Sequence, residues 1–477
     1  MAIKTVSFLC VLCTLIPWGR ADTAADALAA AKKAVRFLTE EVNTEGGYLW
    51  RYSADLGLRE GEGVVTTHTV WTQPPGTPTV GESFLDLYAA TGDQQFLTAA
   101  RQVGGSLRKG QMLSGGWQAS IEFEPERRAK WAYRTHAKQP RKAKDQSSLD
   151  DDKSQSSMRF VVRLDKALSF EDETVHEMAV YALNGLVEHG QFANGGFPQV
   201  YSRTLKETLA DEIDPNAPAS FPDSWSREYQ GHQNYWYRPT LNDNLAPDVF
   251  ATLMLAYRVY GDQRYREAAI KLADFLVLAQ LPEPQPAWAQ QYSYVMQPIW
   301  ARKFEPAAVT GGESQGVIRT LLDIYVSTGD QKYLEPIPRA LDYLERSQLP
   351  DGRLARFYEL GSNRPLYFTK DYRLTYNDSD MPTHYGFQVA SSVAKLRAKY
   401  EEVSALTQPQ LKKRREASGR STGRVSEKEV LTLIESMDDR GAWISMEGMR
   451  YHKRPGAVID MRRTADNLKA LAAFLAE

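Results

Sequence analysis

Cysteine is nearly absent from this chain, and its two cysteines lie close to the N-terminus. Cys10 and Cys13 fall within the first apolar run, which follows Lys4 and ends in small residues. Such a segment is typical of a secretory signal peptide, here residues 1–21. The remaining chain then has no cysteine. Disulfides are therefore excluded, and the core, with or without a metal, must hold the fold together.

Long apolar runs and a surplus of one charge are also missing. Beyond residue 21 no stretch is long enough to span a bilayer, and 58 basic residues stand against 60 acidic ones. This balance gives no electrostatic signal for nucleic acid or for a membrane surface. We therefore expect a protein that is secreted or periplasmic, monomeric, and without a membrane span in its mature form.

Two common kinds of catalytic motif are absent as well. The seven histidines show no metal-ligand spacing, and no Gly-x-Ser-x-Gly nucleophile motif occurs. Chemistry in this chain must therefore rest on other residues, and carboxylates and arginines are the candidates.

Three stretches share a Gly-Asp-Gln sequence between aromatic residues eight positions apart. Apolar residues at helical spacing precede each one, and an amphipathic run follows. Glycine suits the end of one helix, and aspartate suits the cap of the next. The pattern therefore predicts an antiparallel helical hairpin, used at least three times. The stretches are YAATGDQQF (88–96), YRVYGDQRY (257–265) and YVSTGDQKY (325–333).

A second pattern, usually a glycine turn followed by an aromatic residue, recurs at the far ends of such hairpins. Together the two patterns predict an all-α fold, an α/α toroid or barrel in which loops on one face form a cleft. An open helical solenoid that binds proteins shares the hairpins and stays an alternative. The segments are EGGYLW (45–50), SGGWQA (114–119), NGGFPQV (194–200), QPAWAQQ (285–291), DGRLARF (351–357) and RGAWIS (440–445).

The domain organisation follows from these repeats and from composition. We expect a barrel domain over residues 22–400 and, over 401–477, a basic linker followed by a helical tail. Two long insertions interrupt the repeats: the strongly basic segment 125–146 and the segment 202–240, which is rich in Pro, Ser, Asp and Trp. Long loops of this kind in compact domains are usually functional or disordered.

Three consecutive aspartates, Asp150, Asp151 and Asp152, stand in the stretch SLDDDKSQSSMRF (148–160), directly before a predicted helix. Capping of a helix N-terminus explains one carboxylate or two. Three like charges raise one another's pKa unless a cation intervenes, and clustered oxygen ligands favour Ca²⁺ or Mg²⁺. A cation site and a solvated acidic cap both stay open for this stretch.

Three further stretches hold candidate side chains. Asp243 lies in LNDN (241–244), where helix capping is the favoured interpretation and oxygen ligation the other. Arg302 precedes Glu305 in PIWARKFEPAAVTGGES (298–314), where an Arg–Glu pair could brace a turn. In RLARFYELGSNRPLYF (353–368), arginines among aromatic residues suit carboxylate or sugar recognition, although one of them could pair with Glu359. The candidates in that stretch are Arg356, Tyr358, Asn363 and Arg364.

In sequence order, these motifs together with NGGFPQVY resemble the landmarks of the family-ten pectate lyases. The resemblance covers about residues 45–390 and leaves out the region from 400 onward. It implies an α/α barrel that cleaves polygalacturonate, an acidic polysaccharide, by Ca²⁺-assisted β-elimination. It makes Asp150, Asp151 and Asp243 the metal ligands.

The resemblance also assigns the remaining roles. Arg302 becomes the base that takes the C5 proton, and Arg356 and Arg364 hold substrate carboxylates, with Tyr358 and Asn363 beside them. Arginine has a pKa above 12, so we expect burial and neighbouring cations to lower it and activity to rise in alkaline solution.

The sequence departs from the family pattern at several positions. Asp152 and Lys153 replace small residues, Ser202 and Arg203 follow PQVY where proline is expected, and Gly312 replaces serine. Lys153 could compete with Ca²⁺ for the carboxylates. Two rival functions remain: a glycoside hydrolase that uses two carboxylates such as Asp150 and Glu305, and a non-catalytic protein that binds acidic polysaccharide.

Overall fold

The computed structural model describes residues 20–204, 213–418 and 424–477. The predicted signal peptide, with Cys10 and Cys13, lies almost wholly outside these ranges, as does part of the basic linker. Among the described residues, no helix combines the length and the apolar character that crossing a membrane requires.

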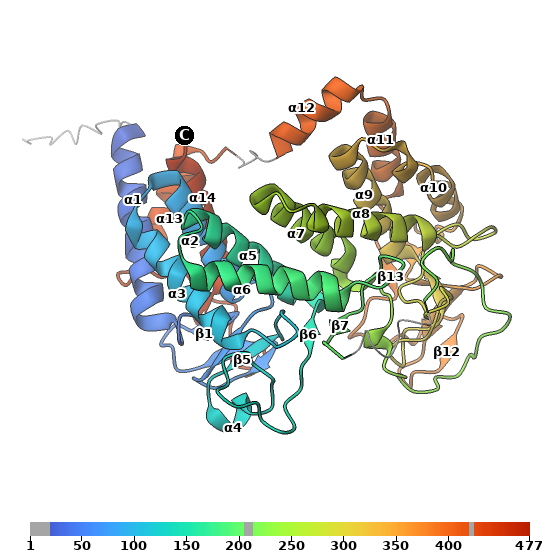
Figure 1. Ribbon diagram of the computed structural model, residues 1–477, viewed down its shortest axis with the longest axis horizontal. Helices are drawn as coiled ribbons and strands as arrows, with labels where there is room; N and C mark the ends of the chain where they lie inside the picture. Colours follow the sequence, from blue (N-terminus) through green and yellow to red (C-terminus); the bar gives the residue numbers. More distant parts are fainter. Residues whose placement is uncertain (1–19, 205–212, 419–423) are drawn as a thin grey trace, which may run out of the picture.

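Helices are the main secondary structure of the described chain, and they follow one another in pairs (Figure 1). The longer ones are α1 (Arg20–Phe37), α2 (Thr77–Thr91), α3 (Gln94–Gly110), α5 (Lys153–Ala167), α6 (Glu173–Gly185), α7 (Leu245–Tyr260), α8 (Gln263–Leu278), α9 (Gly311–Thr328), α10 (Ile337–Arg346), α11 (Val393–Ser404), α12 (Gln408–Ser418), α13 (Glu427–Glu435) and α14 (Met461–Leu475). A single turn, α4 (Pro125–Arg128), lies in the basic insertion.

The Gly-Asp-Gln sequences form the hairpin turns that the sequence predicts. Gly92, at the end of α2, has φ 70°, and the side chain of Asp93 accepts a hydrogen bond from the backbone of α3. Gly261 and Asp262 repeat this arrangement between α7 and α8. Glycine adopts the left-handed conformation at little cost, and the aspartate satisfies a free helical N–H, so the turn chemistry fixes these boundaries.

The hairpins are arranged as a toroid. Along the chain α2 packs against α5, α5 against α7, and α9 against α8 and α11. The last helix, α14, returns to pack against α1 and α2. The predicted α/α toroid is thereby confirmed, and its last helix packs beside the N-terminal helices.

The C-terminal region belongs to this ring, which differs from the expected separate tail. Strand β15 (Val458–Asp460) pairs with β1 (Arg51–Ser53), in the order β14 (Ile444–Ser445), β15, β1, β2 (Arg59–Gly61) and β3 (Gly63–Val64). Leu468, Leu471 and Phe474 of α14 join the main hydrophobic core. The physical reason is that α14 packs its apolar face against α1 and α2, and α13 packs against α1.

Short strands lie at the end of the toroid where α5, α9 and α14 begin (Figure 1). Strand β6 (Ser147–Ser148) leads towards α5, β8 (Ala308–Thr310) into α9, and β15 into α14. The other antiparallel strands are β4 (Thr69–Trp71), β5 (Ser120–Glu122), β7 (Val200–Tyr201), β9 (Leu354–Ala355), β10 (Phe357–Glu359), β11 (Pro365–Phe368), β12 (Leu374–Thr375) and β13 (Gln388–Val389).

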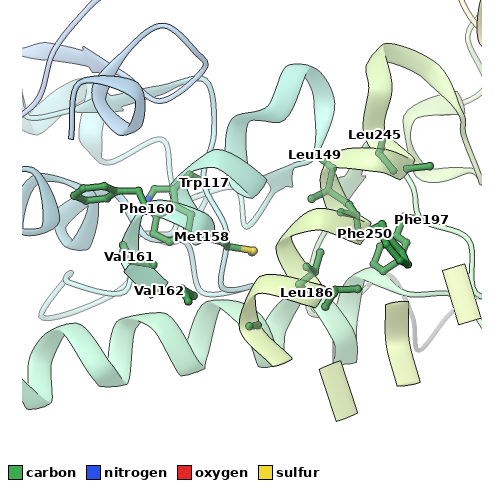
Figure 2. Close-up of a cluster of buried hydrophobic side chains, with 14 of the residues drawn as sticks. Trp117, Leu149, Met158, Phe160, Val161, Val162, Leu186, Phe197, Leu245 and Phe250 are labelled. Carbon is green, nitrogen blue, oxygen red and sulfur yellow. The ribbon is translucent and has the colours of Figure 1, made fainter. Parts of the chain in front are cut away.

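One continuous core runs from Ala27 to Phe474. Figure 2 shows the part beside the acidic stretch, where Leu149 and Leu245 lie near Phe197 and Phe250. Leu149 is fully buried and Leu245 is 1% exposed. These leucines flank the two acidic turns and anchor them to the core.

Candidate active site

The LDDD and LNDN stretches form two turns of the same shape. Asp151 and Asp152 have φ of 47° and 62°, and Asp243 and Asn244 have φ of 49° and 56°. After glycine, Asp and Asn tolerate this left-handed conformation best, because their short side chains bond locally. Each turn leads into an inner helix, α5 or α7, and the two turns pack against each other. The local backbone therefore explains part of the acidic run.

The two turns bring three predicted metal ligands together. Carboxylate oxygens of Asp150, Asp151 and Asp243 all lie within 4.8 Å of one another. Amide side chains hold two of them: Gln73 Nε2 donates to Asp151 at 3.0 Å, and Gln199 Nε2 donates to Asp150 at 3.3 Å. The three oxygens form a small hard-donor set of the kind that Ca²⁺ binds.

The charges of this set are only partly neutralised. Burial and the charges of Asp150 and Asp151 raise the pKa of Asp243 to about 8. Burial and Asp150 also raise the pKa of Asp151 above its ordinary value. Burial tends to raise the pKa of Asp150 too, but Lys153 outweighs it, and the net effect is a lowered pKa. The chain's own cations therefore leave a negative surplus that favours a bound cation.

Lys153 and Arg159 are basic partners of the acidic run. Lys153 Nζ lies 2.7 Å from Asp150 Oδ2 and 3.9 Å from Asp151 Oδ2, with the lysine side chain 8% exposed. Asp152 instead pairs with Arg159 at 2.5 Å. The third aspartate thus braces the turn, while Lys153 lies where it opposes a cation.

Arg302, the predicted base, is tied to Glu305. Its Nε and Nη2 donate to the two oxygens of Glu305 at 2.8 and 2.5 Å. Burial lowers the pKa of Arg302, but the hydrogen bonds and charge of Glu305 outweigh burial and raise that pKa above its ordinary value. The expected lowering is therefore wrong for this arrangement, because the nearest partner is a buried carboxylate.

Arg356 and Tyr385 complete the group around Arg302. Tyr385 Oη donates to Glu305 Oε1 at 2.8 Å, and Arg356 Nη1 donates to Tyr385 Oη at 3.1 Å and to Glu313 at 3.3 Å. Arg356 and Asp243 line one cavity of about 210 Å³. Arg356 therefore lines the same cavity as Asp243, and its carboxylate partner is Glu313 instead of the rival Glu359.

The other predicted substrate-binding residues have different surroundings. Tyr358 is 1% exposed, accepts from Ala355 N at 2.9 Å and donates to Ser347 O at 2.6 Å. Asn363 accepts from Tyr343 Oη at 2.5 Å. The side chains of both residues form hydrogen bonds within the protein, and their substrate-binding role stays a prediction.

Arg364 is exposed and lies over the ring of Tyr376, 3.3 Å from its centroid. The hydroxyl of Tyr376 bonds Glu359, which also pairs with Arg227. In the described chain no contact joins Arg364 to the acidic cluster. The structure therefore does not bring Arg364 together with Arg356, although the two residues are only eight positions apart in the sequence.

A second cavity, of about 480 Å³, lies on the other side of the acidic cluster. Asp151 and Asp243 line it together with Trp50, Arg51 and Arg462. The two ends of the chain therefore contribute to one wall of the cleft. Sequence reasoning missed this wall because Arg462 lies in the region assigned to a tail, and it missed Tyr385 because no motif marks it.

The helical toroid carries a cleft of carboxylates and arginines, and the comparisons with known proteins support a polysaccharide lyase. More particularly, residues 316–431 match the family model described as pectic acid lyase, and the resemblance found in the sequence is confirmed. The matched range includes Arg356, whereas the three aspartates and Arg302 precede it.

Among curated proteins no sequence matches this chain. Among solved structures it is similar to a family 10 polysaccharide lyase from Cellvibrio cellulosa, with 18% identity over 69% of this chain and 98% of that one and a TM-score of 0.45. A point mutant of that lyase, described as a complex with trigalacturonic acid, gives 18% identity over 68% and 98% and the same TM-score of 0.45. Cellobiose 2-epimerase from Bacillus thermoamylovorans B4167 gives 12% over 95% and 98%, with a TM-score of 0.44.

Proposed function

We propose that this protein is an exported pectate lyase that cleaves polygalacturonate by Ca²⁺-assisted β-elimination and releases unsaturated oligogalacturonides. One observation carries the proposal: Asp150, Asp151 and Asp243 converge within 4.8 Å of one another, in a cleft that also holds Arg356. Arg302 belongs to the same electrostatic environment, since its charge acts on the pKa of both Asp150 and Asp151.

The aspartates fit a bound calcium ion in donor type and in charge. All three offer carboxylate oxygens, and the raised pKa of Asp243 reflects burial and also repulsion by Asp150 and Asp151, which a divalent cation offsets. When bound, Ca²⁺ supplies a positive charge that neutralises the substrate carboxylate and stabilises the anion formed by loss of the C5 proton. Arg356, which lines the same cavity as Asp243, adds a planar donor for a uronate carboxylate.

Arg302 stays the proposed base, and its pairing with Glu305 defines a condition for that role. A charged guanidinium has no lone pair to accept a proton, and Glu305 stabilises the charged form. Arg302 must therefore lose its proton before it can accept one from C5, which is easier in alkaline solution and when the contact with Glu305 loosens.

The rival hydrolase has less support. It needs one carboxyl group that stays protonated as a general acid, with a raised pKa. For Glu305, burial favours a higher pKa, but Arg302 outweighs it and lowers the pKa. The pKa of Asp150 is lowered as well. Neither member of the nominated pair is thus held in the acid form.

The deciding experiment is a calcium titration of polygalacturonate cleavage at alkaline pH, with ultraviolet absorbance and reducing ends followed together. The chain lacking residues 1–21 should produce both signals only with calcium and lose them on chelation. Arg302→Ala should lower the rate by about 10²–10⁴-fold, the usual contribution of an acid–base group. Asp150→Ala should lower it more than the roughly 10–100-fold cost of losing an outer metal-site partner.

Other outcomes of this experiment point to the rivals. Reducing ends without absorbance would make the protein a hydrolase, and binding without either signal would make it a non-catalytic binder. The same titration on Lys153→Met tests the contact with Asp150. Because Lys153 Nζ lies 2.7 Å from a proposed ligand oxygen, its removal should lower the calcium concentration needed for half-maximal rate.

A further inference from the structure

The basic insertion, residues 125–146, is a folded segment that the proposed function does not use. It contains eight basic and two acidic residues, in a chain whose formal net charge is −2. Its backbone is held at both sides: Ala132 N donates to Lys144 O at 3.0 Å, and Leu113 N donates to Ala132 O at 3.0 Å. Tyr133, which belongs to the segment, is fully buried. The segment therefore presents its charges from a fixed backbone.

Apart from Arg127, five of its basic side chains are exposed. Within the described part of the chain, none of the five forms an ion pair or a side-chain hydrogen bond, whereas Arg127, Arg134 and Arg203 nearby pair with Glu124, Glu177 and Asp145. Exposed like charges repel one another, so such a group without counter-charges favours an external anion. The five are Lys130, Lys138, Arg141, Lys142 and Lys144.

The segment is continuous with the active-site cleft. It runs directly into β6 and then into the turn that carries Asp150. At its end, Gln146 Nε2 donates to Tyr237 Oη at 2.8 Å. Tyr237 shares a single turn with Tyr235, and the charges of Arg302 and Asp150 both act on the Tyr235 phenol. Figure 1 places α4 on the side of the molecule where the strands and the inner-helix starts lie.

We propose that the basic segment is a second binding surface for the acidic polysaccharide, which holds a part of the polymer outside the cleft. Four of the five cations are lysines, which are flexible point charges and suit attraction along a polyanion more than recognition of one sugar. The neighbouring cleft has a polyuronate as its proposed substrate, so that polyanion is the occupant favoured here over a nucleic acid. The inference rests on the proposed function.

The test compares two sets of five substitutions on long polygalacturonate and on trigalacturonate. The first variant carries K130Q, K138Q, R141Q, K142Q and K144Q. The control carries K166Q, K271Q, K412Q, K413Q and K428Q, which remove the same charge from exposed lysines on α5, α8, α12 and α13. All ten residues are exposed, so both variants should fold, which thermal unfolding checks.

The first variant should raise KM for the long polymer at least roughly tenfold and leave kcat unchanged. Two linked binding sites can increase affinity by at most about 10²–10⁴-fold, so a tenfold increase in KM lies within that limit. The increase should be present at about 0.01 M ionic strength, where charges act over ~30 Å, and vanish near 1 M, where they act over ~3 Å. KM for trigalacturonate should not change. An equal effect of the control variant, or an equal effect on trigalacturonate, would overturn the inference.

Gel retardation in polygalacturonate separates this inference from the proposed function. Suppose that the parent chain cleaves the polymer and that the first variant is retarded as strongly as the parent. This result would support the proposed function and refute the second surface. A parent chain that is retarded without cleaving, with retardation lost only in the first variant, would refute the lyase function and support the surface.

Discussion

At the scale of single residues, the pairing of Arg302 with Glu305 decides how the proposed base behaves. Each guanidinium donor used for Glu305 favours the charged arginine, so Glu305 acts against proton transfer while it positions the side chain. The sequence places the two residues three positions apart but does not give the direction of the pKa shift. That direction depends on how deeply the carboxylate is buried, and Glu305 is 1% exposed.

Glu305→Gln tests this balance through the pH profile. The neutral amide removes the charge that raises the pKa of Arg302, so that pKa should fall. If Arg302 is the base, the alkaline rise in kcat/KM should then begin at lower pH, while the maximal rate is similar or lower because the side chain is less well held. The measurement is kcat/KM across neutral to alkaline pH, with Glu359→Gln, at a half-buried Glu–Arg–Tyr group, as the matched control. An unmoved profile would remove Arg302 from the base role.

At the scale of elements, the hydroxyl of Tyr358 forms a hydrogen-bond pattern that occurs a second time in the chain. Its hydroxyl accepts from Ala355 N and donates to Ser347 O, and Tyr292 does the same with Ala289 N and Ala279 O, at 2.8 and 2.7 Å. Both tyrosines follow an alanine by three positions, after a hairpin's outer helix. This spacing is a signal that sequence analysis could have used to place Tyr358 in the core.

Tyr358→Phe should therefore affect stability and leave substrate binding unchanged. The substitution leaves a buried N–H and a buried carbonyl without their partner, which costs about 1–3 kcal/mol each at most. Tyr292→Phe should cost a similar free energy of unfolding, measured by chemical denaturation. A rise in KM for Tyr358→Phe that Tyr292→Phe does not share would restore Tyr358 to the substrate site.

At the scale of the whole molecule, the C-terminal segment completes the toroid. Leu468 and Leu471 are fully buried and Phe474 is 4% exposed, all against helices from the N-terminal part. Burial of three such side chains contributes about 1.5–3 kcal/mol each, or roughly 5–9 kcal/mol together. A typical domain has only about 5–15 kcal/mol of net stability.

Deletion of residues 424–477 should therefore abolish cooperative folding. Thermal unfolding followed by circular dichroism would show the loss, and activity should disappear with it. Leu468→Ala is the graded control and should cost about 2–5 kcal/mol with the fold retained. A truncated chain with an unchanged unfolding temperature would make this segment the separate tail that the sequence suggested.

The repeats could be predicted because local chemistry specifies them, whereas only the resemblance to the pectate lyases makes Asp150, Asp151 and Asp243 the predicted metal ligands. The Gly-Asp-Gln turns form wherever they occur, and LDDD and LNDN each specify a left-handed turn before a helix. The packing of the C-terminal helices could not be predicted from composition, because the basic run before them resembles a solvated linker. Tyr358, Asn363 and Arg364 look equivalent in the sequence, yet only the packing of their strands decides which of them reaches solvent.

The sequence by itself determined the helical hairpins, their turns and the acidic residues at the start of two inner helices. Each of these features depends on residues within a few positions of one another, where turn and capping preferences act. The tertiary structure alone decided which carboxylates meet. It also decided that Lys153 pairs with Asp150 and Glu305 with Arg302, and that residues from the chain's two ends share a wall of the cleft. Those outcomes depend on burial and on contacts between distant segments, and pairwise distance in the sequence does not encode them.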